Sequence, residues 1–137
     1  MRILGIDHGA KRVGVAVSDP ERKFAFPLEA VPGKDRFKLL TRLCELVSEN
    51  EVGEVVLGLP LTMAGERGPQ AQKVEEFAER LGRKLGADIP IHLWDERLSS
   101  AQADRGRNAV KARDPKDGTR DMMAAVVILQ SFLDRKD

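Results

Sequence analysis

The chain of 137 residues is long enough to bury one hydrophobic core, and its length predicts a single domain that covers residues 1–137. Apolar residues make up 42% and charged residues 33% of the sequence, which is typical of a folded globular protein and argues against a disordered one. The formal net charge is only +1, so binding to a polyanion would depend on a local basic surface. One cysteine excludes an internal disulfide framework and a Cys-based zinc site. With no apolar run of membrane length and no signal-peptide core, the sequence predicts a cytoplasmic protein that binds no membrane.

The first 19 residues predict a β-hairpin with an acidic residue at its turn. Apolar residues in 3–6 form the first strand, residues 9–12 form a polar turn, and valines alternate through 13–17 in the second strand. Asp7 therefore stands on rigid backbone where a buried strand ends. A carboxylate there either caps the turn or belongs to a functional site, and the hairpin alone leaves both interpretations open.

An edge strand and an amphipathic helix are expected next. Pro27 limits a strand over 24–31 to a sheet edge or a bulge. Residues 35–50 have apolar residues at helical spacing and predict an amphipathic helix, on whose apolar face we expect Phe37, Leu40, Cys44 and Val47. Cys44 is interpreted as a small core residue.

A second strand and helix follow. Residues 54–57 form a short strand that ends at Gly58-Leu59-Pro60, before a polar loop with two glycines. A helix begins at Pro69, has one apolar stripe, and stops at Gly86.

The last third of the chain places acidic and basic residues around a strand and a helix. A strand over 89–94 runs into Asp95-Glu96-Arg97, and Ser99 with Gln102 forms a capping box that predicts a helix just after this triplet. Residues 104–120 predict a basic loop that is either a solvated surface segment or a nucleic-acid contact. A buried helix over 119–132 completes the chain.

Four acidic or turn segments are expected at one edge of the sheet. The hairpin strands must be antiparallel, whereas strands separated by helices should be parallel, so the sheet is mixed. Asp7, the turn at 58–60 and Asp95-Glu96 then lie at the carboxyl ends of their strands, where open α/β sheets bind ligands. Asp121, in the first turn of the last helix, either complements the helix dipole or joins these acids. Clustered carboxylates suit Mg²⁺ and phosphodiester chemistry.

Four stretches in the same order resemble one known family. They are DHGAKRVGVAVSD, GLPLTMAGERGPQA, DERLSSAQA and DMMAAVVILQSFL, and together they are similar to the YqgF/RuvX family, which is distantly related to Holliday-junction resolvases. The resemblance spans nearly the whole chain. It implies an α/β domain of the RNase H-like fold, with a mixed five-stranded sheet flanked by helices.

The same resemblance implies a function and a set of site residues. The family is implicated as a nuclease for the 5′ end of precursor 16S rRNA, which implies catalysis and metal binding by Asp7, Glu96 and Asp121 with Mg²⁺ or Mn²⁺ as the cofactor. Asp95 remains an alternative to Glu96, although alternation along a strand lets only one of them face the site. The sequence departs from the family at His8 and Ala10 in the first turn and at Thr62 and Ala64 in the polar loop. His8 is therefore either a structural residue or a phosphate contact.

Several substrates and partners remain open at this point. Basic residues that would contact phosphates are Lys11, Arg12, Arg97, Arg105, Arg107, Lys111 and Arg113. The expected partner is structured RNA, with precursor 16S rRNA and ribosomal precursor particles in first place, and branched DNA is the alternative. We expect a monomer or a weak homodimer. A junction resolvase would favour the dimer, because it engages two strands symmetrically. A third hypothesis is a non-catalytic module that binds nucleic acid or the ribosome.

Overall fold

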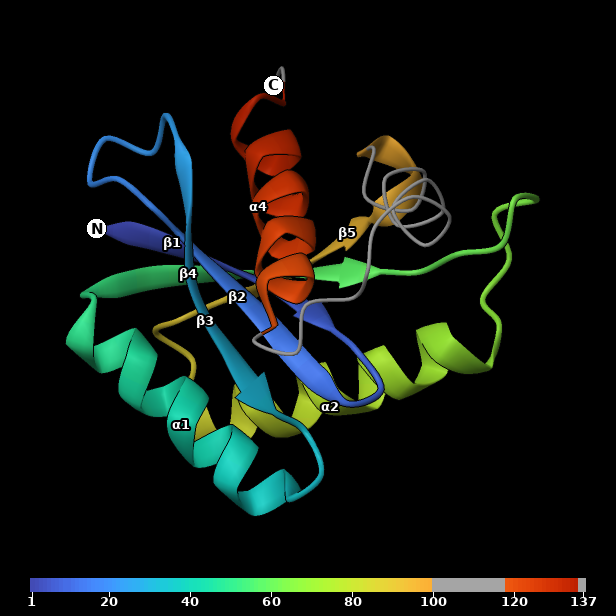
Figure 1. Ribbon diagram of the computed structural model, residues 1–137, viewed down its shortest axis with the longest axis horizontal. Helices are drawn as coiled ribbons and strands as arrows, with labels where there is room; N and C mark the ends of the chain where they lie inside the picture. The colour runs from blue at the N-terminus through green and yellow to red at the C-terminus, as the bar shows by residue number, and fades with distance from the viewer. Residues whose placement is uncertain (100–117, 136–137) are drawn as a thin grey trace.

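The computed structural model describes residues 1–99 and 118–135, which form one five-stranded sheet with helices on both faces (Figure 1). The strands lie in the order β3-β2-β1-β4-β5. Their bounds are β1 Arg2–His8, β2 Arg12–Ser18, β3 Ala25–Pro32, β4 Val52–Leu59 and β5 Ile91–Asp95. β2 pairs antiparallel with β1 and β3, whereas β4 pairs parallel with β1 and β5. The predicted mixed α/β sheet is confirmed.

The prediction for the strand with Pro27 is also confirmed, because β3 lies at the sheet edge. Its register shifts at this proline: Val15 pairs with Glu29 and Ala16 pairs with Pro27, so Leu28 is an extra residue in β3. β4 is longer than the four residues predicted. It continues through Gly58 and Leu59 because these residues pair with Trp94 and Asp95 of β5.

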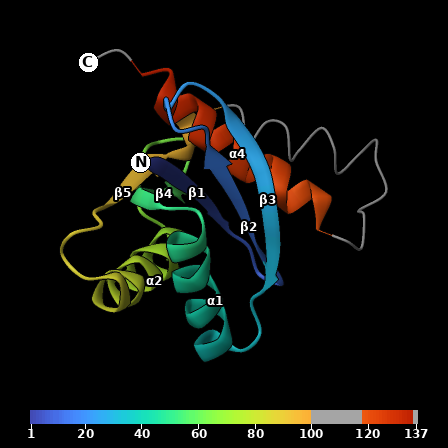
Figure 2. The ribbon, with the colours of Figure 1, turned by 90° about the vertical axis from the view of Figure 1, so that its left-hand side faces the viewer.

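In the described part of the chain, three α-helices form the outer layers (Figure 2). α1 (Arg36–Glu49) and α2 (Pro69–Leu85) cover one face of the sheet, and α4 (Thr119–Leu133) covers the other. Pro69 and Gly86 mark the ends of α2 as predicted, and the structure adds a cap on α1. The Asp35 side chain accepts a hydrogen bond from the Lys38 N–H and caps α1, and Pro69 occupies the first turn of α2. Gly86 ends α2 with a φ of 88°, which glycine adopts without strain.

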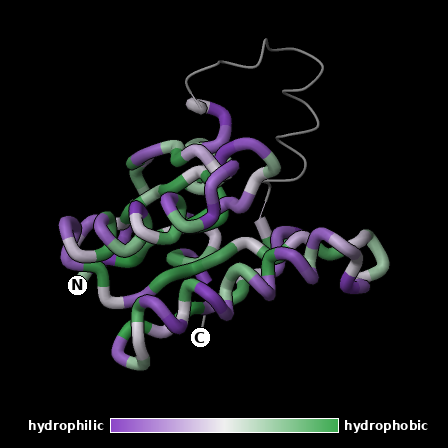
Figure 3. Tube along the Cα trace, turned by 90° about the horizontal axis from the view of Figure 1, so that it is seen from below, coloured by the Kyte–Doolittle hydropathy of each residue, from purple (hydrophilic) through white to green (hydrophobic). Residues whose placement is uncertain are grey.

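The sheet separates two apolar clusters. Leu4 and Ile6 of β1 point into the larger cluster, beneath α1 and α2, whereas Ile3 points into the smaller cluster, beneath α4. Figure 3 shows these strands as the apolar middle of the molecule, with the polar turns of the helices outside. Because β1 alternates between the clusters, the face on which a β1 residue lies decides which helices it contacts.

Two details of the sequence analysis need correction, and a third lies outside the described residues. Phe37 was expected on the apolar face of α1, but it is 70% exposed, because the buried residues of α1 start at Leu39. Its ring instead lies 5.4 Å from the Lys84 ammonium.

The last helix, expected to be buried, buries only one face: Met123 on another face of α4 is 47% exposed. Residues Glu96–Leu98 form a short 3₁₀-helix, η1, and the helix predicted from the capping box falls in residues 100–117, outside the described part. Across the described residues, no helix has the length and apolar character needed to cross a membrane.

Candidate active site

Asp7 lies near the carboxyl end of β1 on the face of the sheet that α4 covers. Ile3, Gly5 and Asp7 alternate onto this face, and a Cβ at Gly5 would come within 2.6 Å of the Leu129 Cβ in α4. Only 6% of Asp7 is exposed. A carboxylate with so little exposure does not serve merely as a surface turn cap.

Asp121 reaches the same place from α4. β-Sheet pairing sets Gly14 opposite Asp7, and the backbone of Asp121 lies so close to Gly14 that a Cβ there would overlap its carbonyl. The Asp121 carboxylate is on the hairpin side of the helix, since a Cβ at Gly9 would lie 3.6 Å from Oδ1. Arg12 Nη1 lies 3.7 Å from Asp121 Oδ2. The first turn of α4 therefore sits on the β1–β2 hairpin beside Asp7.

Glu96 approaches from the other side of β1. It opens η1 directly after β5, and only 2% of it is exposed. A Cβ at Gly58 would lie 3.2 Å from the Glu96 Cγ, which places the Glu96 side chain over Gly58. Leu57 pairs with Ile6 in the parallel β1–β4 ladder. The next residues of these two strands, Gly58 and Asp7, therefore lie at the same level of the sheet. Glycines at positions 14 and 58 thus leave the space that Asp121 and Glu96 occupy.

Asp95 is engaged elsewhere. Its carboxylate accepts from the Arg97 backbone N–H at 2.9 Å and pairs with the Arg97 guanidinium, whose Nη2 lies 2.8 Å from Oδ2. These hydrogen bonds from Arg97 lower the pKa of Asp95. Of the two adjacent acids, Glu96 is the one that lies beside Gly58.

The basic residues predicted to contact nucleic acid divide into four groups. Arg12 lies beside Asp121, at the candidate site. Arg97 is paired with Asp95 and lies against the β4–α2 loop, since a Cβ at Gly65 would be 3.1 Å from its Nη1. Lys11 is exposed in the β1–β2 turn. The remaining four, Arg105, Arg107, Lys111 and Arg113, lie outside the described residues.

His8 is on the opposite face of the sheet from Asp7. Its ring packs on Phe77 of α2, with 4.7 Å between ring centroids. Burial lowers the pKa of His8, and the nearby charges of Arg36 and Lys73 lower it further. Arg36 and Lys73 were not among the predicted contacts, because α1 and α2 bring them to His8 only in the folded chain.

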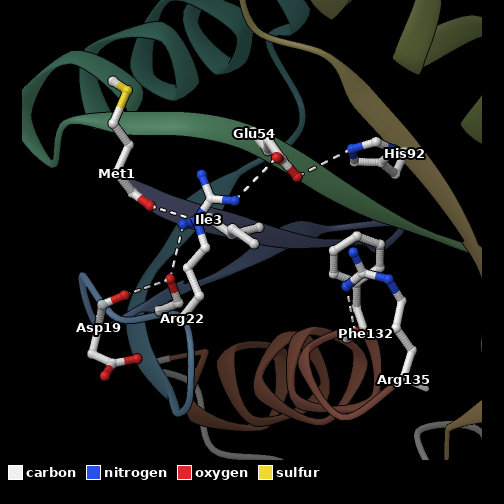
Figure 4. A network of polar contacts seen from close by, with 9 residues as sticks. Met1, Ile3, Asp19, Arg22, Glu54, His92, Phe132 and Arg135 are labelled. Atoms are coloured by element: carbon white, nitrogen blue, oxygen red, sulfur yellow. Dashed lines mark hydrogen bonds and ion pairs between the residues drawn. The ribbon is translucent and has the colours of Figure 1, made fainter. Parts of the chain in front are cut away.

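His92 and Trp94 of β5 make structural contacts. Figure 4 shows Glu54 between Arg22 and His92, with Arg22 Nη1 3.1 Å from Oε1 and His92 Nε2 3.2 Å from Oε2. The His92 ring also stacks on Phe132 at 5.4 Å. The Trp94 indole donates to Ser131 Oγ at 3.0 Å.

The donor chemistry of the acids fits a hard divalent cation with an incomplete protein shell. Carboxylate oxygens are ligands that Mg²⁺ and Mn²⁺ prefer, and Asp7 and Glu96 supply them from buried positions. Within residues 1–99 and 118–135, no group of three His, Cys, Asp or Glu side chains could hold a metal ion as the side chains are placed. A metal site built on these acids would need further ligands from water and from substrate oxygens.

The order and directions of the strands, with helices on both faces of the sheet, define an α/β protein of the RNase H-like fold. The fold agrees: RuvC from Thermus thermophilus, solved with a Holliday junction substrate, matches with a TM-score of 0.62 and 18% identity, over 96% of this chain and 91% of that chain. A second RuvC structure from the same organism matches with a TM-score of 0.60 and 17% identity, over 97% of this chain and 94% of that chain.

Sequence comparison then gives the family. The model of the RuvX family, described as Holliday junction resolvase, matches residues 1–135, and the chain belongs to this family. A relative from Ruminiclostridium cellulolyticum is 44% identical, over 98% of this chain and 95% of the relative, and one from Chloroflexus aggregans is 42% identical, over 98% and 94%. Both relatives carry the provisional name of pre-16S rRNA nuclease. The predicted family is confirmed.

Proposed function

We propose that this protein is a metal-dependent endonuclease that hydrolyses phosphodiester bonds in structured RNA, with precursor 16S rRNA as its substrate. The observation that carries the proposal is the placement of three acids around one strand end: Asp7 on β1, Asp121 over Gly14 on one side and Glu96 over Gly58 on the other. The names of the relatives support the RNA substrate.

Asp7, Glu96 and Asp121 would hold Mg²⁺ or Mn²⁺. When bound, the ion supplies a Lewis acid for a phosphoryl oxygen and lowers the pKa of an attacking water. The contribution of the chain itself is to hold the carboxylates in position. Asp7 pairs with Gly14 of β2 and directly follows Ile6, which pairs with Leu57 of β4. Glu96 is 2% exposed and lies over Gly58, so both carboxylates start from restricted positions.

Arg12 contacts Asp121 and also suits a substrate phosphate. Its guanidinium lies 3.7 Å from Asp121 Oδ2 and is about one-third exposed, so it orients the carboxylate and still faces solvent at the hairpin. A guanidinium in that position suits a phosphate that approaches the acids.

A cleavage assay with two substrates tests the proposal. Wild-type protein with Mg²⁺ or Mn²⁺ is incubated with a precursor-16S 5′-leader RNA and with a four-way DNA junction, beside Asp7→Asn. Asp88→Asn is the matched control, because Asp88 is exposed before β5, at the strand end opposite to Glu96. We expect cleavage of the RNA at a defined position by wild type and by Asp88→Asn, and none by Asp7→Asn.

The two other hypotheses are outcomes of the same assay. Symmetric nicking of the junction with the RNA intact would replace the RNA substrate with branched DNA, in line with the description of the family model. Binding of either substrate without cleavage under both metals would overturn the proposal in favour of a non-catalytic module.

A further inference from the structure

A hollow lies on the other side of the sheet from the acids, beneath the β1–β2 turn. Its volume is about 240 Å³. It is lined by His8 at the end of β1 and Gly9 in the turn, by Gly33 before α1 and Arg36 at its start, and by Gln70 and Lys73 near the start of α2. A second hollow of about 340 Å³ shares His8, Arg36 and Lys73 and adds Glu76 and Arg80 along α2. Together they form a track, which we call the basic track.

The charge of the basic track is positive. Three cations, Arg36, Lys73 and Arg80, line it against one acid, Glu76. Within the described residues, no carboxylate lies within 4 Å of the charged nitrogens of these three cations. The N-terminal turns of α1 and α2, which carry the positive ends of the helix dipoles, also border the first hollow. The track therefore suits an anion.

The shape and lining favour a polymer backbone over a base. Cations follow one another along α2 at positions 73 and 80, as an extended polyanion requires. The aromatic residue of the track, Phe77, is 4% exposed and lies against the His8 ring, so it offers no free face on which a base could stack. Contacts of this kind provide affinity without reading sequence.

The position connects the basic track to the acids. Asp7 and His8 are consecutive residues of β1, and their side chains lie on opposite faces of the sheet. We propose that the basic track binds the phosphodiester backbone of the substrate strand. The strand would run from the acids, around the β1–β2 turn, to the track on the other face of the sheet. This inference rests on the proposed nuclease function and adds a second backbone contact to it.

Binding measured in EDTA separates this inference from catalysis. The probe is a fluorescein-labelled single-stranded RNA from the precursor-16S 5′ leader, titrated by anisotropy over a series of salt concentrations. The test variant is Arg36→Gln/Lys73→Gln. The control, Arg83→Gln/Lys84→Gln, removes the same charge from the far end of α2.

We expect the test variant to bind the RNA about tenfold more weakly and to reduce the magnitude of the slope of log Kobs against log[salt] by about 1.4, which corresponds to two lost contacts at about 0.7 each. The control should match wild type. Equal weakening by both variants would reduce the effect to net charge and overturn the inference, as would unchanged binding by the test variant.

Two further results distinguish the possible failures. If inorganic phosphate perturbs the His8 ring resonances at submillimolar concentration while the test variant binds RNA normally, the track serves a free anion and the strand assignment is wrong. The chain has two histidines, so His92 is the internal reference. If wild type binds RNA through the track but cleaves nothing, the nuclease proposal fails and the backbone contact stands.

Discussion

The carbonyl of Asp121 occupies the space that a side chain at Gly14 would need, and Gly14 is the sheet partner of Asp7. This contact seats the first turn of α4 on the hairpin and brings one candidate metal ligand to the other. It makes position 14 a sensitive probe of the site.

Gly14→Ala should displace the start of α4. Because the new methyl group meets backbone rather than a flexible side chain, we expect the free energy of unfolding to fall by about 1–3 kcal/mol. Cleavage should fall further than stability alone explains. Gly82→Ala is the control: it lies inside α2 with its nearest neighbour at 3.7 Å, so it should raise stability by up to about 1 kcal/mol. Equal denaturation midpoints for the two variants would contradict the close approach.

Gly58→Ala tests the position of Glu96. An added Cβ would lie 2.6 Å from Ile128 Cδ1 and 3.2 Å from Glu96 Cγ. Combining it with Ile128→Val removes the Cδ1 atom but leaves Glu96 displaced. In a double-mutant cycle we expect the second change to recover stability relative to the sum of the single variants, whereas cleavage stays low. Recovery of cleavage together with stability would show that Glu96 is not held by this contact.

Much of the fold follows from local patterns in the sequence. Alternation in β1 and β2, the start of α2 at Pro69 and its stop at Gly86 depend on neighbouring residues alone, so they predict the elements correctly. Phe37 was placed wrongly because helical spacing leaves a choice of face, and the packing of α1 on the sheet buries Leu39 instead.

The candidate site was only partly accessible from sequence. Strand topology predicted that Asp7 and Asp95-Glu96 lie at one edge of the sheet, and the family resemblance selected Asp7, Glu96 and Asp121. The contacts that engage Asp95 with Arg97 agree with the choice of Glu96. The basic track could not be predicted, because His8, Arg36 and Lys73 come from three separate segments with no shared motif. Long-range packing decides both features.

Phe132 joins α4 to the central and outer strands. It is 4% exposed, and its ring meets Trp94 edge-on at 5.3 Å. Phe132→Ala should lower the free energy of unfolding by about 3–5 kcal/mol and change the fluorescence of Trp94, the single tryptophan. Phe37→Ala, at a 70% exposed position, should cost less than about 1 kcal/mol and leave the spectrum unchanged. Similar losses for the two variants would contradict the burial of Phe132.

The Glu29–Arg42 pair should make stability depend on pH. Arg42 donates two hydrogen bonds of 2.8 Å to Glu29 and joins β3 to α1, and these bonds lower the pKa of Glu29 in the folded state. The folded protein then binds fewer protons, so the stabilisation is complete above the usual pKa of 4.5 and disappears as the pH falls through the lowered value.

Because both side chains are one-third exposed, solvent screening limits the effect to about 0.5–1 kcal/mol. We expect Glu29→Gln to be less stable than wild type at pH 7 and equal to it near pH 2, by urea denaturation at both values. Glu21→Gln, on an exposed turn, should show no difference at either pH. A deficit for Glu29→Gln that persists unchanged at pH 2 would exclude the ion pair as its cause.

The most direct test of the site compares four acid variants in one Mg²⁺-dependent cleavage assay: Asp7→Asn, Glu96→Gln, Asp121→Asn and, as the control, Asp95→Asn. The first three should each lose more than about a hundredfold in rate, since even an outer-shell partner of a metal site is worth 10–100-fold, while their unfolding stays cooperative. Asp95→Asn should cleave at close to the wild-type rate. An inactive Asp95→Asn beside an active Glu96→Gln would show that the metal site is built on the other acid.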